Sequence, residues 1–306
     1  MNYTDYQFPV HPSKKLRLLI NTDVKNEADD PYAVAHALLS PRFEHLGIIA
    51  AHFGTHKQAD SMEASYAGVK ELLSIMRFPA ELAIKGAPTP LPNEFTPVPS
   101  DGARAIVDAA MADSSLPLYV LFMGPLTDMA SALLTEPRIA GRMTCVWIGG
   151  DHYPSGGPEF NMMNDIAAAN VVFRSTLPVW QVPRSTYQQV VVSLAELESR
   201  VLPYGALGRY LFEQLVAYGQ TPAALHTIRT GECWCLGDSP AVGLLLSEYG
   251  YHYEWIQAPE VGARMEYIHT GRNRPIRVYQ TVDSRFILED FYAKLKLFAE
   301  KGAGQA

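Results

Sequence analysis

Four carboxylates gather in one short segment near the start of the chain, directly after an apolar run. In LLINTDVKNEADDPYAVAHALLS (18–40), Asp23 follows the apolar residues, and Glu27, Asp29 and Asp30 come within the next seven positions. Like charges repel one another, so this crowding destabilises a fold unless a cation lies among the carboxylates or they share a catalytic task. A solvated loop would account for the same segment, and its residues alone leave both interpretations open.

Three familiar loop motifs do not fit this segment. An EF-hand loop needs oxygen ligands at alternate positions and a central glycine, whereas Lys25 takes a ligand position and 21–30 contains no glycine. Phosphatases that form an aspartyl-phosphate use the first Asp of D-x-D as the nucleophile, and an amide, Asn21, stands there. A loop that cradles phosphate also requires glycines. The residues therefore argue against these three classes of site.

The elements on either side of the segment predict an α/β fold. Apolar runs indicate strands at 16–20, 45–53, 116–124, 144–150 and 177–183. Helical spacing indicates helices between them, at 31–40, 59–76, 126–134 and 165–175. This alternation predicts an open, mainly parallel sheet with helices on both faces. From about 190 the pattern is mainly helical, before a last strand at 276–282 and a last helix at 285–301.

No linker, repeat or block of charge divides the chain, so we expect a single domain over 1–306 with a helix-rich C-terminal half. In open α/β sheets, ligands bind beyond the carboxyl ends of the strands. Asp23 follows the first predicted strand, and Asp29 and Asp30 come at the start of the next helix, with Asp30 expected as its N-cap. The acidic segment is therefore expected at the ligand-binding rim of the sheet.

The composition narrows the partners and the compartment. The chain has 306 residues, 48% of them apolar, and a formal net charge of -7 with no basic block, which argues against nucleic acid or an anionic membrane as the main partner. No apolar run approaches the length of a membrane span. Cys145, Cys233 and Cys235 are too few, and wrongly spaced, for a disulfide framework or a zinc site. We therefore expect a soluble, cytoplasmic protein with a small-molecule substrate.

Four motifs, in order along the chain, resemble those of the nucleoside hydrolase family of the inosine–uridine-preferring type. That family has D-x-D-P-G-x-D-D after its first strand, and Asp23, Asp29 and Asp30 match its last three acidic positions. GPLTDMASAL (124–133) resembles its G-P-L-T-N-x-A-x-A-L. The segment 147–173 resembles its M-G-G, E-F-N and D-P-x-A-A, and GDSPAVGLL (237–245) resembles its H-D-P-x-A-x-x.

The resemblance implies calcium-dependent hydrolysis of the N-glycosidic bond of ribonucleosides, or of a related N-ribosyl compound, to ribose and free base. It implies a Ca²⁺ site formed by Asp23, Asp30, Asp238 and the backbone carbonyl of Thr127. It also implies that Asp23 is the general base that takes a proton from a water held by the metal. The family's ribose-binding positions are here Asp29, Glu159 and Asn161. Dimers and tetramers are common in the family, so a homo-oligomer is expected by analogy.

The chemistry of calcium supports this set of ligands. Calcium takes six to eight oxygen ligands, including carboxylates and carbonyls, and a divalent cation would relieve the repulsion in the acidic segment. Carboxylates also suit the positive charge that develops when a glycosidic bond breaks. Taken singly, Asp30 and Asp238 fit the cap position of a helix better, and only the joint order of the motifs favours metal ligands.

The chain departs from the family pattern mainly where the base leaves. Gly237 stands where inosine–uridine members have the His that helps to protonate the base, and the G-N after the second strand is Gly54–Thr55. An aromatic side chain could assist instead, with Trp234, Tyr153 and Tyr187 as candidates, and His226 could supply an acid. A cationic N-riboside would need neither, because its base leaves neutral.

Two rival functions remain open from the sequence. The first is a calcium-containing protein that binds ribose or nucleosides without turnover, and the second is a hydrolase of a ribosyl compound that is not a nucleoside. The hydrolase interpretation is favoured because Asp23 serves a base role that binding alone would not require.

Overall fold

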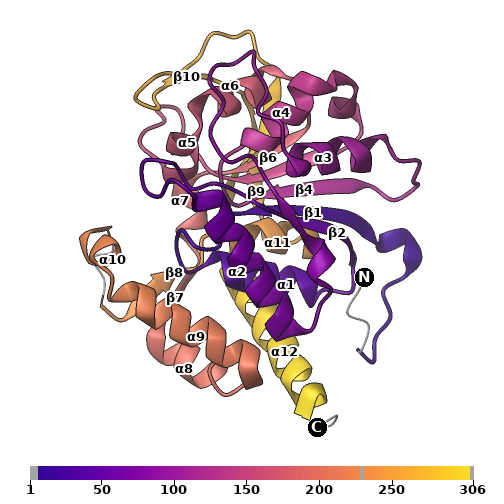
Figure 1. The fold of residues 1–306 in the computed structure, drawn as a ribbon, viewed down its shortest axis with the longest axis vertical. Coiled ribbons are helices and arrows are strands. Elements are labelled where there is room, and N and C mark those ends of the chain that lie inside the picture. Colours follow the sequence, from indigo (N-terminus) through magenta and orange to yellow (C-terminus); the bar gives the residue numbers. More distant parts are fainter. Residues whose placement is uncertain (1–5, 228–230, 304–306) are drawn as a thin grey trace.

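The structure, a computed structural model, describes residues 6–227 and 231–303. An eight-stranded sheet crosses the molecule, with helices on both of its faces (Figure 1). From one edge to the other, the strands are β3 (Ala83–Lys85), β2 (Phe43–Ala50), β1 (Leu16–Thr22), β4 (Leu118–Phe122), β5 (Thr144–Ile148), β6 (Val179–Val182), β12 (Pro275–Thr281) and β9 (His252–Gln257). Neighbours from β3 to β12 are parallel, and β9 is antiparallel to β12. The expected open, mainly parallel sheet is confirmed.

Two hydrophobic cores lie on opposite faces of this sheet. On β1, Leu18 and Ile20 point into one core and Leu19 into the other, so every residue of the strand is buried. Because a central parallel strand is covered on both faces, its sequence is a continuous apolar run instead of an alternating one. This explains why the run at 16–20 predicts the strand so well.

Different sets of helices cover the two cores. The first core is covered by α1 (Asp30–Leu38), α2 (Ser61–Met76), α8 (Leu194–Arg200), α9 (Gly205–Gly219), α11 (Ser239–Leu246) and α12 (Ser284–Ala303). The second is covered by α3 (Asp101–Met111), α4 (Thr127–Thr135) and α6 (Ile166–Arg174). In Figure 1 these three helices lie above the sheet, and α1, α2 and α12 lie below it.

The remaining elements are short. They are the helices α5 (Phe160–Asn164), α7 (Arg184–Tyr187) and α10 (Pro222–Thr227), the 3-10 turns η1 (Pro12–Lys14), η2 (Ala80–Leu82) and η3 (Pro137–Gly141), and the antiparallel pairs β7 (Val191–Ser193) with β8 (Cys233–Cys235) and β10 (Glu260–Val261) with β11 (Tyr267–Ile268). Within the described ranges, no helix has both the length and the apolar character needed to cross a membrane.

The predicted elements occur close to their expected bounds, and several further elements were missed. One is α3, where the Ser100 hydroxyl accepts a hydrogen bond from the backbone N–H of Ala103, and Ala103, Ile106 and Ala110 form its buried face. The cap and this spacing were readable in the sequence. Another is β9, whose side chains are almost all exposed, so no buried alternation marks it. The helix start is also corrected by one residue, because Asp29 and not Asp30 precedes α1 at the cap position.

Candidate active site

The register of the central strands brings Asp23 next to the end of β4. Asn21 pairs with Phe122, and the backbone N–H of Met123 donates to the carbonyl of Asn21 at 2.9 Å. Because the strands are parallel and end together, the residues just beyond them, Asp23 and Met123, share one rim. A side chain at Gly124 would meet the Asp23 carboxylate, at 3.5 Å from its Cγ. The site therefore begins where the two strands end.

A cleft opens at this rim and contains most of the predicted site residues. Its lining combines carboxylates with amide, aromatic and small side chains: Asp23, Asn26, Glu27, Asp29, Asp30, Met123, Ile148, Glu159, Phe160, Asn161, Tyr187, Gly237 and Asp238. These residues come from the segments after β1, β4, β5, β6 and β8, which are far apart in the sequence. Of the predicted residues, Asp23, Asp29, Asp30, Glu159, Asn161, Tyr187 and Asp238 lie here.

Three carboxylates at the centre of the cleft are close enough to share one cation. One oxygen from each of Asp29, Asp30 and Asp238 lies within 4.8 Å of the others. Asp30 and Asp238 are buried, and Asp29 and Asp238 occupy helix-cap positions without a capping hydrogen bond from their side chains. Asp29 Oδ2 instead accepts from the N–H of Asp238 at 3.2 Å, which links the two helix starts. The capping explanation for Asp238 is therefore not supported.

Asp23 lies against this group with one oxygen free. Asp30 Oδ1 accepts from the backbone N–H of Asp23 at 3.0 Å and from the hydroxyl of Thr22. Asp23 is buried, and in the described part of the chain its Oδ2 has no hydrogen-bond partner. A buried carboxylate oxygen without a donor is unfavourable unless a ligand completes it.

Burial and mutual repulsion raise the pKa values of these carboxylates, so that their simultaneous ionisation is unfavourable. Burial raises the pKa of Asp23 well above its usual range, and the charges of Asp30 and Asp29 raise it further. The pKa of Asp238 is raised well above its usual range by burial and then by Asp29 and Asp30. A divalent cation among them would reverse both effects. The free oxygen and the all-oxygen donor set therefore fit a metal such as calcium.

The structure corrects the prediction that Thr127 contributes a carbonyl ligand, because Thr127 does not line the cleft. Its hydroxyl donates to Asp165 Oδ2 at 2.7 Å and lies 2.8 Å from Nε2 of His52. Thr127 is the first residue of α4, and such a carbonyl points along the helix toward the residue four positions later. Met123, at the end of β4, lines the cleft in its place.

Glu159 and Asn161 form a tightly bonded edge of the cleft. Glu159 Oε2 accepts from the backbone N–H groups of Gly150 at 2.7 Å and Met162 at 2.9 Å, and its pKa is raised by burial but held down by these bonds. Asn161 Nδ2 donates to the carbonyls of Met123 at 3.1 Å and Ile148 at 2.9 Å. Both side chains are therefore fixed in position before any ligand binds.

Of the four residues predicted to assist the leaving group, Tyr187 lines the cleft, and Tyr153 and Trp234 do not. Tyr187 lines the cleft, and its hydroxyl donates to Glu159 Oε1 at 3.2 Å. Tyr153 is corrected: it does not line the cleft, and its hydroxyl donates to Gln181 Oε1 at 2.7 Å. Trp234 is corrected as well, because it is buried in β8 against the ring of Tyr218. The side chain of His226 lies outside what the structure describes.

Sequence reasoning missed five residues of the cleft: Asn26, Glu27, Met123, Ile148 and Phe160. The signal for Asn26 and Glu27 was the loop itself, which is longer than the D-x-D-P-G-x-D-D pattern allows. The signal for Met123 was its place as the last residue before a Gly-Pro turn at a strand end. Phe160 stands between Glu159 and Asn161, but nothing in its residue type indicated that it would face the cleft.

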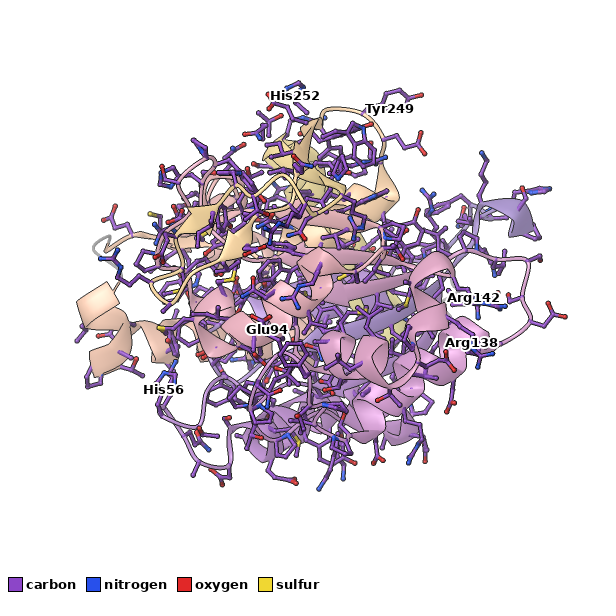
Figure 2. The ribbon with its side chains drawn as sticks, turned by 90° about the horizontal axis from the view of Figure 1, so that it is seen from above. His56, Glu94, Arg138, Arg142, Tyr249 and His252 are labelled. Atoms are coloured by element: carbon purple, nitrogen blue, oxygen red, sulfur yellow. The ribbon has the colours of Figure 1, made fainter. Side chains whose placement is uncertain are left out.

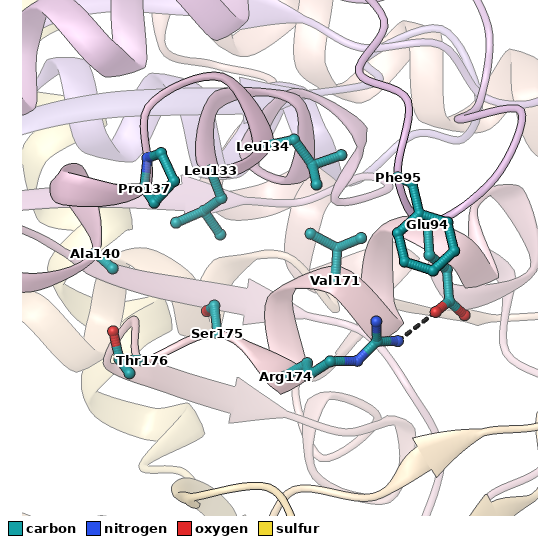
Figure 3. A pocket seen from close by; sticks show the side chains of 10 residues that line it. All are labelled: Glu94, Phe95, Leu133, Leu134, Pro137, Ala140, Val171, Arg174, Ser175 and Thr176. Atoms are coloured by element: carbon teal, nitrogen blue, oxygen red, sulfur yellow. Dashed lines mark hydrogen bonds and ion pairs between the residues drawn. The ribbon is translucent and has the colours of Figure 1, made fainter.

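A larger and mainly apolar hollow lies on the face of the sheet that α3, α4 and α6 cover (Figure 3). It has a volume of about 300 Å³ and lies between α4, η3 and α6, where Leu133, Pro137 and Val171 line it. Its charged residues, Glu94 and Arg174, pair with each other at its rim. No cluster of carboxylates is found there among the described residues, so the acidic cleft is the stronger candidate for chemistry.

Comparison with known proteins gives the family of the chain. Residues 18–289 match the family described as inosine-uridine preferring nucleoside hydrolase. The chain belongs to this family. The pyrimidine-specific ribonucleoside hydrolase RihA of Salmonella paratyphi A is 24% identical over 195 residues, which cover 56% of this chain and 61% of that enzyme. The alignment thus spans less than two thirds of the length of RihA.

Solved structures of nucleoside hydrolases share the fold. The purine-preferring ribonucleoside hydrolase from Gardnerella vaginalis has a TM-score of 0.74 at 20% identity, covering 92% of this chain and 99% of that chain. The inosine-uridine preferring nucleoside hydrolase from Bacillus anthracis has a TM-score of 0.67 at 16% identity, covering 92% and 99%. At such identities these likenesses establish the fold alone.

Two departures from the nucleoside hydrolase pattern contact each other in the structure. Asn21 replaces the first Asp of D-x-D, and Asp128 replaces the Asn of G-P-L-T-N. Both side chains are buried, and Asn21 Nδ2 donates to Asp128 Oδ2 at 2.9 Å. Asp128 also accepts from Ser100 Oγ at 2.5 Å and from the N–H of Ala87 at 2.9 Å. The amide on β1 and the carboxylate on α4 thus stand in the opposite order to the family pattern, and they form a direct hydrogen bond.

Proposed function

We propose that the protein hydrolyses the N-glycosidic bond of ribonucleosides, or of a related N-ribosyl compound, to ribose and free base, and that it depends on calcium. The observation that carries this proposal is that Oδ2 of Asp23 is buried and has no hydrogen-bond partner among the described residues, in a cleft that Glu159 and Asn161 also line. Membership of the nucleoside hydrolase family supports it.

Asp23, Asp30 and Asp238 would hold the cation, with the carbonyl of Met123 in the role first expected of Thr127. When bound, calcium neutralises these carboxylates and makes a nearby water more acidic. Asp29 would accept hydrogen bonds from a ribose hydroxyl. These assignments follow from the shared lining of the cleft and from the oxygen donors that each residue presents.

In the reaction, Asp23 takes a proton from the attacking water while the oxygen of this water bonds to the anomeric carbon. The bond between that carbon and the base breaks, and both electrons go to the base nitrogen. The ribose gains positive charge in the transition state, and the surrounding carboxylates stabilise it. Glu159 and Asn161, fixed by their backbone partners, would orient the sugar.

The test is the release of reducing sugar from inosine, uridine and 4-nitrophenyl riboside, together with the metal content of dialysed protein. We expect ribose from at least one substrate, about one calcium per chain, and a higher melting temperature with calcium. The Asp238→Ala variant is expected to lose the bound calcium and the gain in melting temperature. Binding of ribose without release of base from any substrate would identify a binding protein instead, and protein without metal or thermal response would refute the calcium site.

We also propose that the protein is a cytoplasmic homo-oligomer, a dimer or a tetramer. The edge strand β9 exposes Tyr253 and Trp255, with 37% and 62% of their surfaces accessible. An open sheet edge with large apolar side chains is a favourable surface for association. The thiols of Cys145 and Cys235, which form no disulfide in the described part of the chain, are compatible with a reducing compartment. Sedimentation of the protein and of Trp255→Glu tests the assembly, and a wild type that sediments as a monomer would refute it.

A further inference from the structure

Glu27 is a carboxylate in the cleft to which the reaction above gives no task. It lies in the lengthened loop 24–28, and within the described ranges its carboxylate forms no hydrogen bond or ion pair. Its negative charge raises the pKa of Asp29, Tyr218 and Cys235. Glu27 lines the cleft together with Asp29, Tyr187 and Gly237, so it shares the cleft with both the acidic centre and the wall formed by Tyr187 and Gly237.

This wall is the one where the leaving group is expected. Gly237 follows β8 at the family's His position, next to Asp238. A Cβ added to Gly237 would lie 2.9 Å from Cδ2 of Tyr187, so the ring of Tyr187 fills the space that a side chain at 237 would use. The aglycone would thus meet a carboxylate and an aromatic ring, and no imidazole from position 237.

The loop that contains Glu27 is held in place on its other side. The N–H of Asn26 donates to the carbonyl of Asp23 at 2.7 Å, and Lys57 Nζ donates to the carbonyl of Asn26 at 3.1 Å. Lys57 also lies over the ring of Phe160, 5.1 Å from its centroid. These contacts fix the loop between β1 and the segment after β2, so Glu27 is presented to the cleft from an anchored turn.

The charge of the cleft remains negative even with a metal. In the described part of the chain, six carboxylates and no basic side chain line it. Lys57 and a divalent cation would supply three positive charges against these six. Arg184 is the basic residue near Tyr187, and its charge is paired with Asp151 while its Nη1 donates to the carbonyl of Pro158 at 2.8 Å. Seen from above, Arg138 and Arg142 lie on the flank opposite His56, which precedes Lys57 (Figure 2). Such a field attracts cations and repels phosphate groups.

We infer that the cleft selects N-ribosyl compounds whose aglycone is a cation, such as N-ribosylpyridinium compounds, and that Glu27 is the specificity-determining residue that faces this charge. The inference rests on the hydrolysis proposed above. Water adds to the anomeric carbon and its proton goes to Asp23, while the electrons of the C–N bond neutralise the ring nitrogen. The base therefore leaves neutral, and no proton donor is needed where Gly237 stands. The ring of Tyr187 adds a surface that attracts cations.

The experiment compares kcat/KM for two probes, nicotinamide riboside and 4-nitrophenyl riboside, in the wild type and in Glu27→Gln. Glu27→Gln removes the charge and keeps the shape, and it should lower the preference for the cationic probe by about 10-fold or more, mainly through KM, as expected for a lost charged contact. Glu81→Gln is the matched control, because Glu81 is exposed and outside the cleft, and it should keep the wild-type preference. Nicotinic acid riboside, in which a carboxylate replaces the carboxamide on the same ring, should be a poorer substrate than nicotinamide riboside.

The outcomes separate this inference from the proposed function. Hydrolysis of 4-nitrophenyl riboside without a preference for the cation, or with one that Glu27→Gln leaves unchanged, overturns the inference alone. A loss of kcat confined to inosine and uridine in Glu27→Gln would make Glu27 an acid, which also overturns it. If the wild type hydrolyses none of the substrates, binding is measured by calorimetry instead. Asp23→Asn should bind nicotinamide riboside more tightly than nicotinic acid riboside, and this preference should be lost in Asp23→Asn/Glu27→Gln. The same preference in the two variants, or no preference in either, would refute the inference.

Discussion

The two walls of the cleft differ in how they are built. On the wall proposed to hold the metal and the ribose, side chains follow strand ends or begin helices and are fixed by backbone bonds, as Glu159 at the N-cap of α5 is by the N–H groups of Gly150 and Met162. On the aglycone wall, Glu27 lies in a lengthened loop and Gly237 leaves its space to Tyr187. Strand ends and helix starts that are bonded to the backbone cannot move without disturbing the packed elements, whereas a loop can lengthen at small cost. The difference predicts that the proposed aglycone side of the cleft varies more easily than the side with Glu159 and Asn161.

The largest effect should come from removing Asp23, the proposed general base. Asp23→Asn is expected to lower kcat/KM by roughly 10²–10⁴-fold, because a general base is lost, and further if the metal binds less tightly. The protein should stay folded, since the amide keeps the size of the side chain. Steady-state kinetics with 4-nitrophenyl riboside, together with circular dichroism, measures both. A variant with near wild-type rates would remove Asp23 from the mechanism.

Substitutions of Asn21 and Asp128, which hydrogen-bond each other, should have strongly non-additive effects on the free energy of unfolding. Asn21→Asp places a second buried carboxylate 2.9 Å from Asp128 and should cost roughly 3–5 kcal/mol of unfolding free energy. Asp128→Asn should cost about 1–3 kcal/mol, because Ser100 and Ala87 lose a charged acceptor.

The double variant Asn21→Asp/Asp128→Asn restores an amide–carboxylate pair in the opposite order. It should be more stable than Asn21→Asp by at least half of the loss, as measured by urea unfolding. Simple addition of the two single costs would show that the side chains do not act as a pair.

Metal removal should make stability depend on pH with a definite sign. Burial, with the charge of Asp30, raises the pKa of Glu27 to about 7, and burial raises that of Asp128 to about 6. These two groups hold protons more strongly in the folded chain than in the unfolded chain, so chelated protein should lose stability as the pH rises from about 4 to about 7. Calcium should flatten this decline. Thermal unfolding across this range, with and without chelator, measures it, and identical profiles would contradict a metal in the acidic centre.

The smallest effects should separate two aromatic residues. Tyr187→Phe removes the hydrogen bond to Glu159 at the junction of the two walls and should lower kcat/KM by about 3- to 10-fold, in line with one lost bond. Trp234→Phe keeps an aromatic ring against Tyr218 and should leave kcat/KM within about twofold. Both are measured with 4-nitrophenyl riboside. A larger loss of kcat/KM in Trp234→Phe than in Tyr187→Phe would indicate that Trp234, and not Tyr187, assists the leaving group.

Residue order along the chain was enough to predict the sheet, the acidic centre and the family. The apolar run before Asp23 identified the central strand, because a strand covered on both faces has no polar alternation. Asp23, Asp30 and Asp238 could be assigned to one site although more than 200 positions separate the last two, because each follows a recognisable motif. Local patterns of this kind are set by backbone geometry and burial, which the sequence expresses directly.

Tertiary structure alone decided which neighbours of those motifs face the cleft. Thr127 lies within a motif, yet it begins a helix and its hydroxyl binds Asp165, while Met123 at the strand end lines the cleft. Trp234 and Tyr187 are both aromatic residues in predicted rim segments, and only the packing of β8 against α9 buries the first and leaves the second in the cleft. A residue's type and position fix which contacts it can make. The direction in which its side chain points depends on elements distant in the sequence, and for that reason the aglycone wall could be described only from the fold.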